Sequence, residues 1–363
     1  MRVAVIHYWL INWRGGERVL KAISDMYPQA DIFTHVYDPA LVARELPGKT
    51  VASTFVGRLP FARRHYQKYL PLMPLALEQL DLRQYDLVIS NESGPAKGVI
   101  VGPHAQHLCY CLSPMRYLWD MYPDYYAGAG SITRAVMAPA LHYMRLWDQT
   151  SAQRVDKYVA ISRFIATRIG KYYRRQADVI HPPVAVERFS LSKSSDDFYL
   201  SVGQLVAYKR ADLLVSAFNE LGKRLVIIGE GELLARLKKS AKPNIELLGR
   251  QPDDLIRDFY SRCKALVFPG VEDFGIVPVE AMASGKPVIA LGAGGALDTI
   301  VDGITGILYA DQSAEGLVNA IRRFESQQGM FDPQVIRAHA QQFSTERFAA
   351  QFKVAVDSLM VGG

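Results

Sequence analysis

The feature that most constrains the fold of this chain is a repeated alternation of short apolar runs with segments of helical periodicity. In the second half, β-type runs at 198–202, 224–228, 245–248, 265–268 and 288–291 alternate with stretches whose apolar residues recur every three or four positions. Such alternation is typical of a parallel sheet with helices on both faces. The second half is therefore predicted to be a doubly wound α/β domain, with helices that begin near Ala211, Glu232, Pro252 and Val277.

The first half repeats the pattern. It opens with the apolar run VAVIHYWL, continues through Gly15 and Gly16, which we interpret as a turn, and then enters the helical pattern ERVLKAISDMY. Further β-type runs follow at 31–36, 86–90, 106–112 and 157–162. A second parallel sheet covered by helices is therefore expected in this half.

Two consecutive prolines, Pro182 and Pro183, follow His181 and can continue neither a helix nor a central strand. We therefore predict a domain boundary here, which divides the chain into an N-terminal domain of residues 1–183 and a C-terminal domain of residues 184–344. Residues 345–363 have helical spacing and are expected to pack back on the N-terminal domain.

The composition supports two domains and bears on the location of the protein. A chain of 363 residues with 49% apolar residues is long enough for two conventional cores. No apolar run reaches the roughly 20 residues of a membrane-spanning helix, and the N-terminus lacks the pattern of a signal peptide. The cysteines, Cys109, Cys111 and Cys263, have no zinc-site spacing and are expected to be reduced and mostly buried. We expect a cytoplasmic protein with at most peripheral membrane contact.

The charge is uneven, because residues 1–190 carry 23 Lys and Arg against 15 Asp and Glu, whereas residues 191–363 carry 19 against 21. A basic half is compatible with nucleic acid, anionic lipid or an anionic substrate. The aromatic residues do not alternate with cations along a strand, and no nucleic-acid-reading motif is present, which argues against nucleic acid. Two readings remain for a basic cluster: a solvated helix face, or a contact with anionic lipid. Its members are Arg58, Arg63, Arg64, His65 and Lys68, among Phe61, Tyr66 and Tyr69.

The most informative stretch for function is FPGVEDFGIVPVEAMASG, residues 268–285. A strand ends in Pro-Gly, a loop follows, and a helix begins near Val277, so the amides of Phe274, Gly275 and Ile276 are expected at a helix N-terminus. Such amides and the helix dipole suit a diphosphate. A carboxylate can accept hydrogen bonds from the vicinal hydroxyls of a sugar, and we predict that Glu272 contacts the donor sugar and Glu280 the ribose. The alternative is that both glutamates are ordinary surface residues.

The segment EDFGIVPVEAMASGKPVIA resembles the Glu-x7-Glu signature of family-four retaining glycosyltransferases. Three other segments of the second half, SVGQLVAYKRADLLVSAF, IIGEGE and GGALDTIVDGITGILY, are similar to that family's donor domain. In the first half, WRGGERVL, CYCLSPMRYLWD and the run from RVDKYVAISRFIATRI to VIHPPV resemble bacterial mannosyltransferases. The resemblance implies a GT-B fold, with two doubly wound Rossmann-like domains facing across a cleft, and transfer that retains anomeric configuration.

Roles carried over by this resemblance give a candidate site. Lys209 matches the lysine that neutralises the leaving diphosphate, so no metal ion or other cofactor is expected; no Asp-x-Asp or ligand-spaced His cluster stands at a strand end. The resemblance implies Glu272 and Lys209 as catalytic residues. Further donor-binding residues are Gly15, Gly16, Gly203, Gln204, Arg210, Phe274, Gly275, Ile276 and Glu280, and acceptor-side residues are Ser113, Arg116 and Tyr117.

Three residues depart from the family pattern. Gln204 stands in place of an arginine, Leu112 in place of a histidine and Ile161 in place of an asparagine. An amide cannot stabilise departing phosphate as a cation does, although Arg210 is available to compensate. Because of these departures, one alternative function is a non-catalytic protein that only binds sugar nucleotides. A second alternative is a GT-B epimerase.

The predicted function is metal-independent transfer of a hexose from a nucleotide diphosphate sugar. The acceptor is expected to be a saccharide or a lipid-linked saccharide in bacterial polysaccharide or glycolipid synthesis. Similarity to mannosyltransferases favours GDP-mannose as donor over GDP-rhamnose and UDP-sugars.

Overall fold

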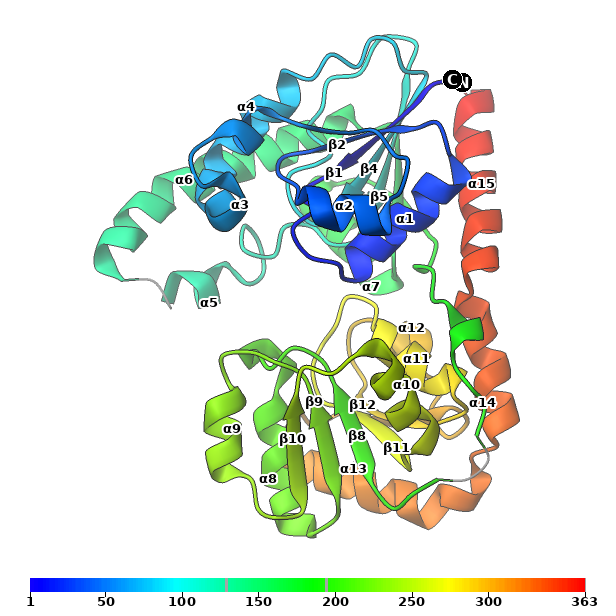
Figure 1. The fold of residues 1–363 in the computed structure, drawn as a ribbon. Coiled ribbons are helices and arrows are strands. Elements are labelled where there is room, and N and C mark those ends of the chain that lie inside the picture. Colours follow the sequence, from blue (N-terminus) through cyan, green and yellow to red (C-terminus); the bar gives the residue numbers. More distant parts are fainter. Residues whose placement is uncertain (128–129, 193–194, 363) are drawn as a thin grey trace. The chain divides into compact units, whose positions relative to one another are not determined.

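The structure is a computed structural model, and it describes residues 1–127, 130–192 and 195–362. The chain forms two compact units. The N-terminal unit comprises Met1–Pro183 together with Phe348–Gly363, and the C-terminal unit comprises Val184–Arg347. Each unit contains one parallel sheet with helices around it (Figure 1).

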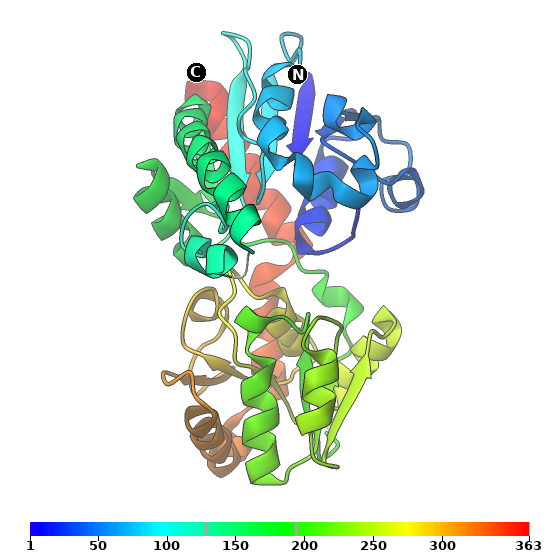
Figure 2. The ribbon, with the colours of Figure 1, turned by 90° about the vertical axis from the view of Figure 1, so that its left-hand side faces the viewer.

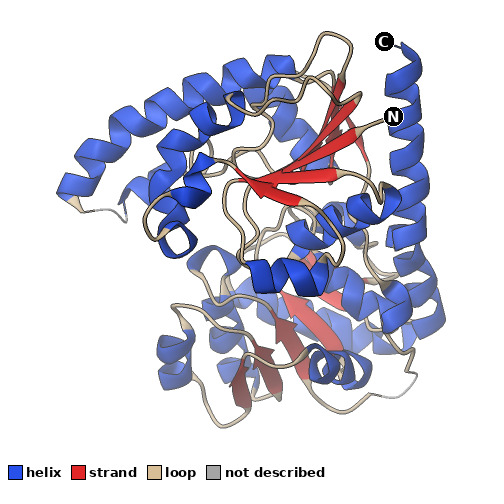
Figure 3. Cartoon of the chain, turned by 45° about the horizontal axis from the view of Figure 1, so that its top comes forward, coloured by secondary structure: helices blue, strands red, loops and turns tan. Residues whose placement is uncertain are grey.

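The N-terminal unit is built on a seven-stranded parallel sheet in the order β3-β2-β1-β4-β5-β6-β7. Its central strands are buried along their whole length, because helices cover both faces of the sheet (Figure 3). The strands are β1 (Val3–His7), β2 (Asp31–Thr34), β3 (Val51–Ser53), β4 (Leu87–Glu92), β5 (Gln106–Cys111), β6 (Lys157–Ala160) and β7 (Ala177–Val179).

The helices of this unit differ in one respect from the sequence prediction. Gly15 and Gly16 were predicted to form a turn before a helix, but they are the first two residues of α1. The helices are α1 (Gly15–Met26), α2 (Pro39–Glu45), α3 (Ala62–His65), α4 (Met73–Glu78), α5 (Tyr122–Ala127), α6 (Ser131–Ser151), α7 (Arg163–Tyr173) and α15 (Thr345–Gly362), with 3-10 turns η1 (Phe55–Arg58), η2 (Tyr66–Leu72) and η3 (Ala152–Arg154).

Most of helix α15 packs within the N-terminal unit, although it follows the C-terminal unit in sequence. The rings of Phe348 and Phe352 lie 5.6 and 5.9 Å from the ring of Tyr110 on β5. All three side chains are fully buried. An aromatic side chain buries about 150–250 Å², so these contacts fix the helix on the sheet.

The C-terminal unit has a six-stranded parallel sheet in the order β10-β9-β8-β11-β12-β13. The strands are β8 (Tyr199–Val202), β9 (Leu225–Ile228), β10 (Ile245–Gly249), β11 (Ala265–Phe268), β12 (Val288–Leu291) and β13 (Gly306–Tyr309). The helices are α8 (Ala211–Leu221), α9 (Leu234–Ser240), α10 (Asp253–Arg262), α11 (Ile276–Ala283), α12 (Ala296–Thr299), α13 (Ala314–Gln327) and α14 (Pro333–Ala340), with 3-10 turns η4 (Val186–Arg188), η5 (Ala207–Lys209), η6 (Gln328–Met330) and η7 (Gln341–Phe343). The prediction of two Rossmann-like domains is confirmed.

Candidate functional site

Both sheets contain a point at which the order of strands reverses. In the C-terminal unit the chain runs outward from β8 to β9 and β10, then returns to place β11 on the other side of β8. The loops after β8 and β11 therefore leave in opposite directions and open a crevice at the carboxyl ends of the strands, where such folds bind ligands. Lys209 follows β8, and Glu272 and Gly275 follow β11.

An ion pair joins these two loops. The Nζ atom of Lys209 lies 2.9 Å from Oε1 of Glu272, and the two side chains are 20% and 22% exposed. Oε1 is itself shielded from solvent and has no hydrogen-bond partner with suitable angles in the described chain, so the contact is an electrostatic pair. The two loops approach each other closely at Gly270, where a Cβ atom would lie only 2.9 Å from Cα of Lys209. This approach is possible because glycine has no side chain.

The loop after β12 closes on the same glutamate. The amide of Gly295 donates to the carbonyl of Glu272 at 2.8 Å. A Cβ atom on Gly294 would lie 2.5 Å from that carbonyl, and one on Gly295 would lie 2.3 Å from Cα of Phe274. The loop after β12 therefore fixes the backbone of Glu272, and the loop after β8 contacts its side chain through Lys209.

Helix α11 begins directly after this loop. Gly275 is its N-cap and has φ +95°, a left-handed conformation that favours glycine. The amides of Gly275 and Ile276 donate to no residue in the described part of the chain, and the third helical position is Pro278, which has no amide hydrogen. Phe274 is buried against Phe343, so its side chain belongs to the core and only its backbone is available to a ligand. The arrangement suits an anion at the helix N-terminus.

Glu280 lies on α11 and is half buried. Its Oε2 accepts a hydrogen bond from Oη of Tyr260, at 3.0 Å. Tyr260 is fully buried on α10, so it holds one carboxylate oxygen in a fixed position. Tyr260 was not predicted, because in the sequence it is only one apolar position in a helical pattern.

The other residues predicted to bind donor lie in the loop after β8. Gly203 follows the strand, and a Cβ atom there would lie 3.6 Å from Nζ of Lys209. Gln204 is exposed. Arg210, expected to compensate for Gln204, is left-handed at φ +55° and makes a part-exposed ion pair with Asp212 at 3.1 Å. An exposed pair of this kind is worth at most about 1 kcal/mol, so Arg210 remains available to an anionic ligand.

The N-terminal unit has its reversal between β1 and β4. Gly16 lies here, and a Cβ atom on it would approach Oη of Tyr8 to 2.5 Å and Cδ1 of Leu112 to 2.9 Å. The side chain of Asn91, on β4, donates to the carbonyl of Gly16 at 2.8 Å. Burial raises the pKa of Tyr8, so its hydroxyl is neutral. Sequence reasoning found the glycines but missed Tyr8 and Asn91.

A buried charge cluster anchors the carboxyl end of β4. Nζ of Lys97 lies 2.9 Å from Oε1 of Glu92 and also contacts Oδ1 of Asp148 on α6, and all three side chains are fully buried. Burial raises the pKa of Glu92. Burial by itself would lower the pKa of Lys97, but the neighbouring carboxylates of Asp148 and Glu92 outweigh it, so the pKa of Lys97 is raised. The carbonyl of Glu92 accepts from the amide of Leu112 at 2.7 Å, so the cluster supports the start of the next loop.

The predicted acceptor-side segment is held by Arg168 of α7. Nη1 of Arg168 donates to Oγ of Ser113 at 2.8 Å, and Nη2 donates to the carbonyl of Pro114 at 3.3 Å and to Oδ1 of Asp120 at 2.5 Å. Ser113 is buried by this contact, whereas Arg116 and Tyr117 stay partly exposed. Arg168 was not predicted from the sequence, because its partners are about fifty residues away.

The two apolar departures in this unit are core residues. Leu112 is 9% exposed and Ile161 is 6% exposed. Leu112 lies against the position of Gly16. A histidine or asparagine at either place would need a polar partner, and the apolar side chains need none.

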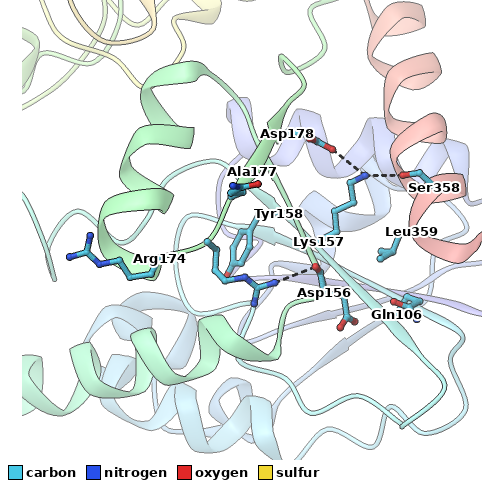
Figure 4. A pocket seen from close by; sticks show the side chains of 11 residues that line it. Gln106, Asp156, Lys157, Tyr158, Arg174, Ala177, Asp178, Ser358 and Leu359 are labelled. Atoms are coloured by element: carbon cyan, nitrogen blue, oxygen red, sulfur yellow. Dashed lines mark hydrogen bonds and ion pairs between the residues drawn. The ribbon is translucent and has the colours of Figure 1, made fainter. Parts of the chain in front are cut away.

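A separate hollow of about 740 Å³ opens in the N-terminal unit (Figure 4). Its lining includes Gln106, Lys157 and Ala177, the first residues of β5, β6 and β7, so it lies at the amino ends of the strands and away from the candidate residues. Nζ of Lys157 forms an ion pair there with Oδ2 of Asp178 at 3.1 Å and donates a hydrogen bond to Oγ of Ser358 at 2.8 Å. The candidate residues instead follow the carboxyl ends of strands, which is where folds of this kind bind ligands.

Within residues 1–127, 130–192 and 195–362, no group of three or more His, Cys, Asp or Glu side chains is arranged to hold a metal ion. The three cysteines are buried and unpaired, and burial raises the pKa of Cys263 to about 12. No helix in the described part of the chain has the length and apolar character needed to cross a membrane.

Comparison with known families gives two matches that together cover most of the chain. Residues 13–188 match the family described as Glycosyltransferase Family 4, and residues 185–342 match the family described as Glycosyl transferases group 1. The junction between the matches is close to the division between the two units.

Two individual relatives match about half of this chain each. An uncharacterized glycosyltransferase of Methanocaldococcus jannaschii is 34% identical over 171 residues, which cover 46% of this chain and 48% of that protein. The O-antigen chain mannosyltransferase RfbU of Salmonella typhimurium is 24% identical over 210 residues, 52% of this chain and 60% of RfbU. The chain thus spans about half the length of the archaeal relative.

Among solved structures, Anabaena HepE in complex with UDP has a TM-score of 0.74 and 18% identity, with 99% of this chain and 100% of HepE covered. At that identity the likeness shows the fold.

Proposed function

Since the chain belongs to the group 1 and family 4 glycosyltransferases, we propose that it transfers a hexose from a nucleotide diphosphate sugar to a carbohydrate acceptor. The observation that carries the proposal is the Lys209–Glu272 pair beside the N-terminus of α11. The pair combines a cation for a leaving diphosphate with a carboxylate for sugar hydroxyls. Both stand on loops that converge at a strand reversal, which is where this fold binds nucleotides.

In the proposed reaction the amides of Gly275 and Ile276 and the ammonium group of Lys209 stabilise the diphosphate as the bond to the sugar breaks. Fixed donors aimed at developing charge lower a barrier without reorganising, and loss of one costs about 10²–10³ in rate. Glu272 orients the sugar, and Glu280, held by Tyr260, binds the ribose. No metal ion is needed to neutralise the diphosphate. The anomeric configuration is retained, as in the family.

The donor and acceptor belong to the same proposal. We propose GDP-mannose as donor, supported by similarity to the mannosyltransferase RfbU; the UDP bound in the structure of HepE makes a UDP-sugar the rival. The acceptor is proposed to be a saccharide or a lipid-linked saccharide, bound by the N-terminal unit near Arg116 and Tyr117. The reaction is then placed in the cytoplasm, at the inner face of the plasma membrane when the acceptor is lipid-linked.

A thermal-shift panel with GDP, UDP, ADP and their sugars tests donor binding. A ligand at about 100 times its dissociation constant stabilises the folded chain by about 2.7 kcal/mol. We expect GDP and GDP-mannose to give the largest shifts, and the absence of a shift with every nucleotide would contradict the proposal.

A second candidate is a protein that binds sugar nucleotides without turning them over. The observation that favours it is the apolar burial of Leu112 and Ile161, which removes two polar side chains found in family members. Slow hydrolysis of donor without acceptor separates the candidates, because a transferase releases nucleotide diphosphate from its donor and a binding protein does not.

A further inference from the structure

One segment of the N-terminal unit has cations and no acidic residue. From residue 46 to residue 77 the sequence contains no Asp or Glu. Arg58, Arg63, Arg64 and Lys68 are exposed, and none of them makes an ion pair with any residue in the described ranges. Solvated cations on a protein surface are usually interspersed with acidic side chains, so an uninterrupted basic stretch indicates an anionic partner.

Phe61 lies in the middle of these cations and is 78% exposed. Its φ is +52°, a left-handed conformation that is a genuine outlier for a bulky residue. Phe61 is not part of the core cluster formed by Val56, Ala62 and Met73 beneath it. An aromatic residue at this position therefore adds no buried surface to the fold and strains the backbone. Glycine would adopt the left-handed conformation without that strain. A side chain that the fold does not use is a candidate for contact with a partner.

Apolar side chains continue from Phe61 along η2 and α4. Leu72 and Leu75 are 40% and 49% exposed, whereas Met73 and Ala76 on α4 are buried. We call the exposed set the basic apolar face; its members are Arg58, Phe61, Arg63, Arg64, Lys68, Leu72 and Leu75.

Helix α6 lies next to this segment, because its Met144 and Trp147 share a core cluster with Leu70 and Leu77. Tyr143 and Leu146, on the outer side of α6, are 48% and 54% exposed. Figure 2 looks onto this side of the N-terminal unit, where α6 and the helices of residues 55–78 both face the viewer. The helix adds further apolar surface to the same side.

We propose that the basic apolar face docks the protein on an anionic lipid bilayer. Its cations meet the phosphate headgroups, and Phe61, Leu72 and Leu75 enter the interfacial region. Charge complementarity identifies the partner as anionic, and exposed leucines beside the cations fit acyl chains rather than a phosphate backbone alone. The inference rests on the proposed function only in that it makes the acceptor a lipid-linked saccharide held at that surface.

Vesicle co-sedimentation of the full chain tests the docking. With phosphatidylcholine vesicles that contain phosphatidylglycerol, we expect binding at low salt that weakens as salt is added. The double substitution Arg63→Glu and Arg64→Glu is expected to weaken binding at least tenfold, since each cation near such a surface contributes about a fivefold factor. Lys238→Glu with Lys239→Glu on α9 is the matched control and should bind like the parent chain.

Phe61→Gly separates docking from folding. Because glycine prefers the left-handed conformation, the variant should keep the thermal stability of the parent while binding vesicles several-fold more weakly. Met330→Ser, which removes an apolar side chain that is 69% exposed in the C-terminal unit, is its control.

Absence of binding to anionic vesicles at low salt overturns the proposal, and so does equal loss in the variants and their controls. Preferential binding of single-stranded DNA that competes with vesicles also overturns it. Nucleotide-induced thermal shifts should be unchanged in every variant, so failure of docking is distinguishable from failure of the proposed transferase function.

Discussion

Nζ of Lys209 lies 2.9 Å from Oε1 of Glu272, although the two residues belong to loops that follow different strands. The pair exists because β8 and β11 are neighbours in the sheet, so that their carboxyl ends open at the same edge. Both side chains are about one fifth exposed, which leaves them accessible to a ligand while water screens them only partly.

Replacement of either partner tests the proposed mechanism. We expect Lys209→Ala and Glu272→Ala each to lower kcat by about 10²–10³, because a cation for the leaving group or a carboxylate for the sugar is lost. Lys223→Ala is a matched control, since Lys223 makes a similar pair with Glu325 at 2.8 Å in the same unit. Near-normal turnover in either site variant would remove that residue from the mechanism.

The left-handed glycine at the start of α11 is expected to be needed for binding diphosphate. Gly275→Ala places a Cβ atom 3.3 Å from Cγ of Pro278 and strains the backbone by about 1–2 kcal/mol. The affinity for nucleoside diphosphate, measured by calorimetry, should fall about tenfold. Gly222→Ala carries the same backbone strain at φ +67° in open space, and it should lower stability without changing affinity.

Tyr260 is expected to position Glu280 for the nucleotide. Tyr260→Phe removes one hydrogen bond, costing about 1 kcal/mol of stability, and lets the carboxylate rotate. We expect a several-fold higher KM for the donor with a smaller change in kcat. The control is Tyr199→Phe, which removes an equivalent bond to Glu325 at 3.0 Å. Equal kinetics in the two variants would mean that the bond is only structural.

Arg168 is expected to act on acceptor geometry alone. Lysine cannot reach Ser113, Pro114 and Asp120 together, because it lacks the planar fork of arginine. In Arg168→Lys, hydrogen exchange of residues 113–120 should rise and transfer should fall, while thermal shifts by nucleotides stay as in the parent. Arg175→Lys, which alters a guanidinium group that donates to the backbone carbonyls of Ala152 and Asp156, should leave exchange in that segment unchanged.

Stability is expected to fall in mild acid because two histidines are buried in the neutral form. Burial lowers the pKa of His35 and of His107 to about 4, from an ordinary value of about 6.5. The unfolded chain therefore binds more protons between these values, and stability decreases as pH falls from about 6.5 to about 4.

The loss is at most about 3 kcal/mol for each histidine. Melting temperatures recorded across this range should fall less steeply in His107→Gln than in the parent. His142→Gln, at an exposed position on α6, should follow the parent curve. Parallel curves for all three chains would contradict this origin of acid sensitivity.

The strands that the sequence predicted best are those buried on both faces. The runs at 265–268 and 288–291 coincide with β11 and β12, because continuous apolar residues bounded by Pro-Gly and Lys-Pro leave little choice of limits. The edge strands β3 and β7 were missed, since each has only three residues and is partly exposed. The helical position of Gly15 and Gly16 was also missed, because glycine favours a turn on local grounds and tertiary packing against Tyr8 overrides that preference.

The chain by itself determined two α/β domains, because alternating apolar and helical periods leave no other way to bury so much apolar surface. It also predicted the candidate site around residues 268–285, since a Gly-containing loop, a helix start and two glutamates stand close together in sequence. Only the tertiary structure decided which side chains meet. Strand order and helix packing bring together residues that are far apart in the sequence. Three contacts depend on this: the ion pair of Lys209 with Glu272, the hydrogen bond from Tyr260 to Glu280, and the hydrogen bond from Arg168 to Ser113.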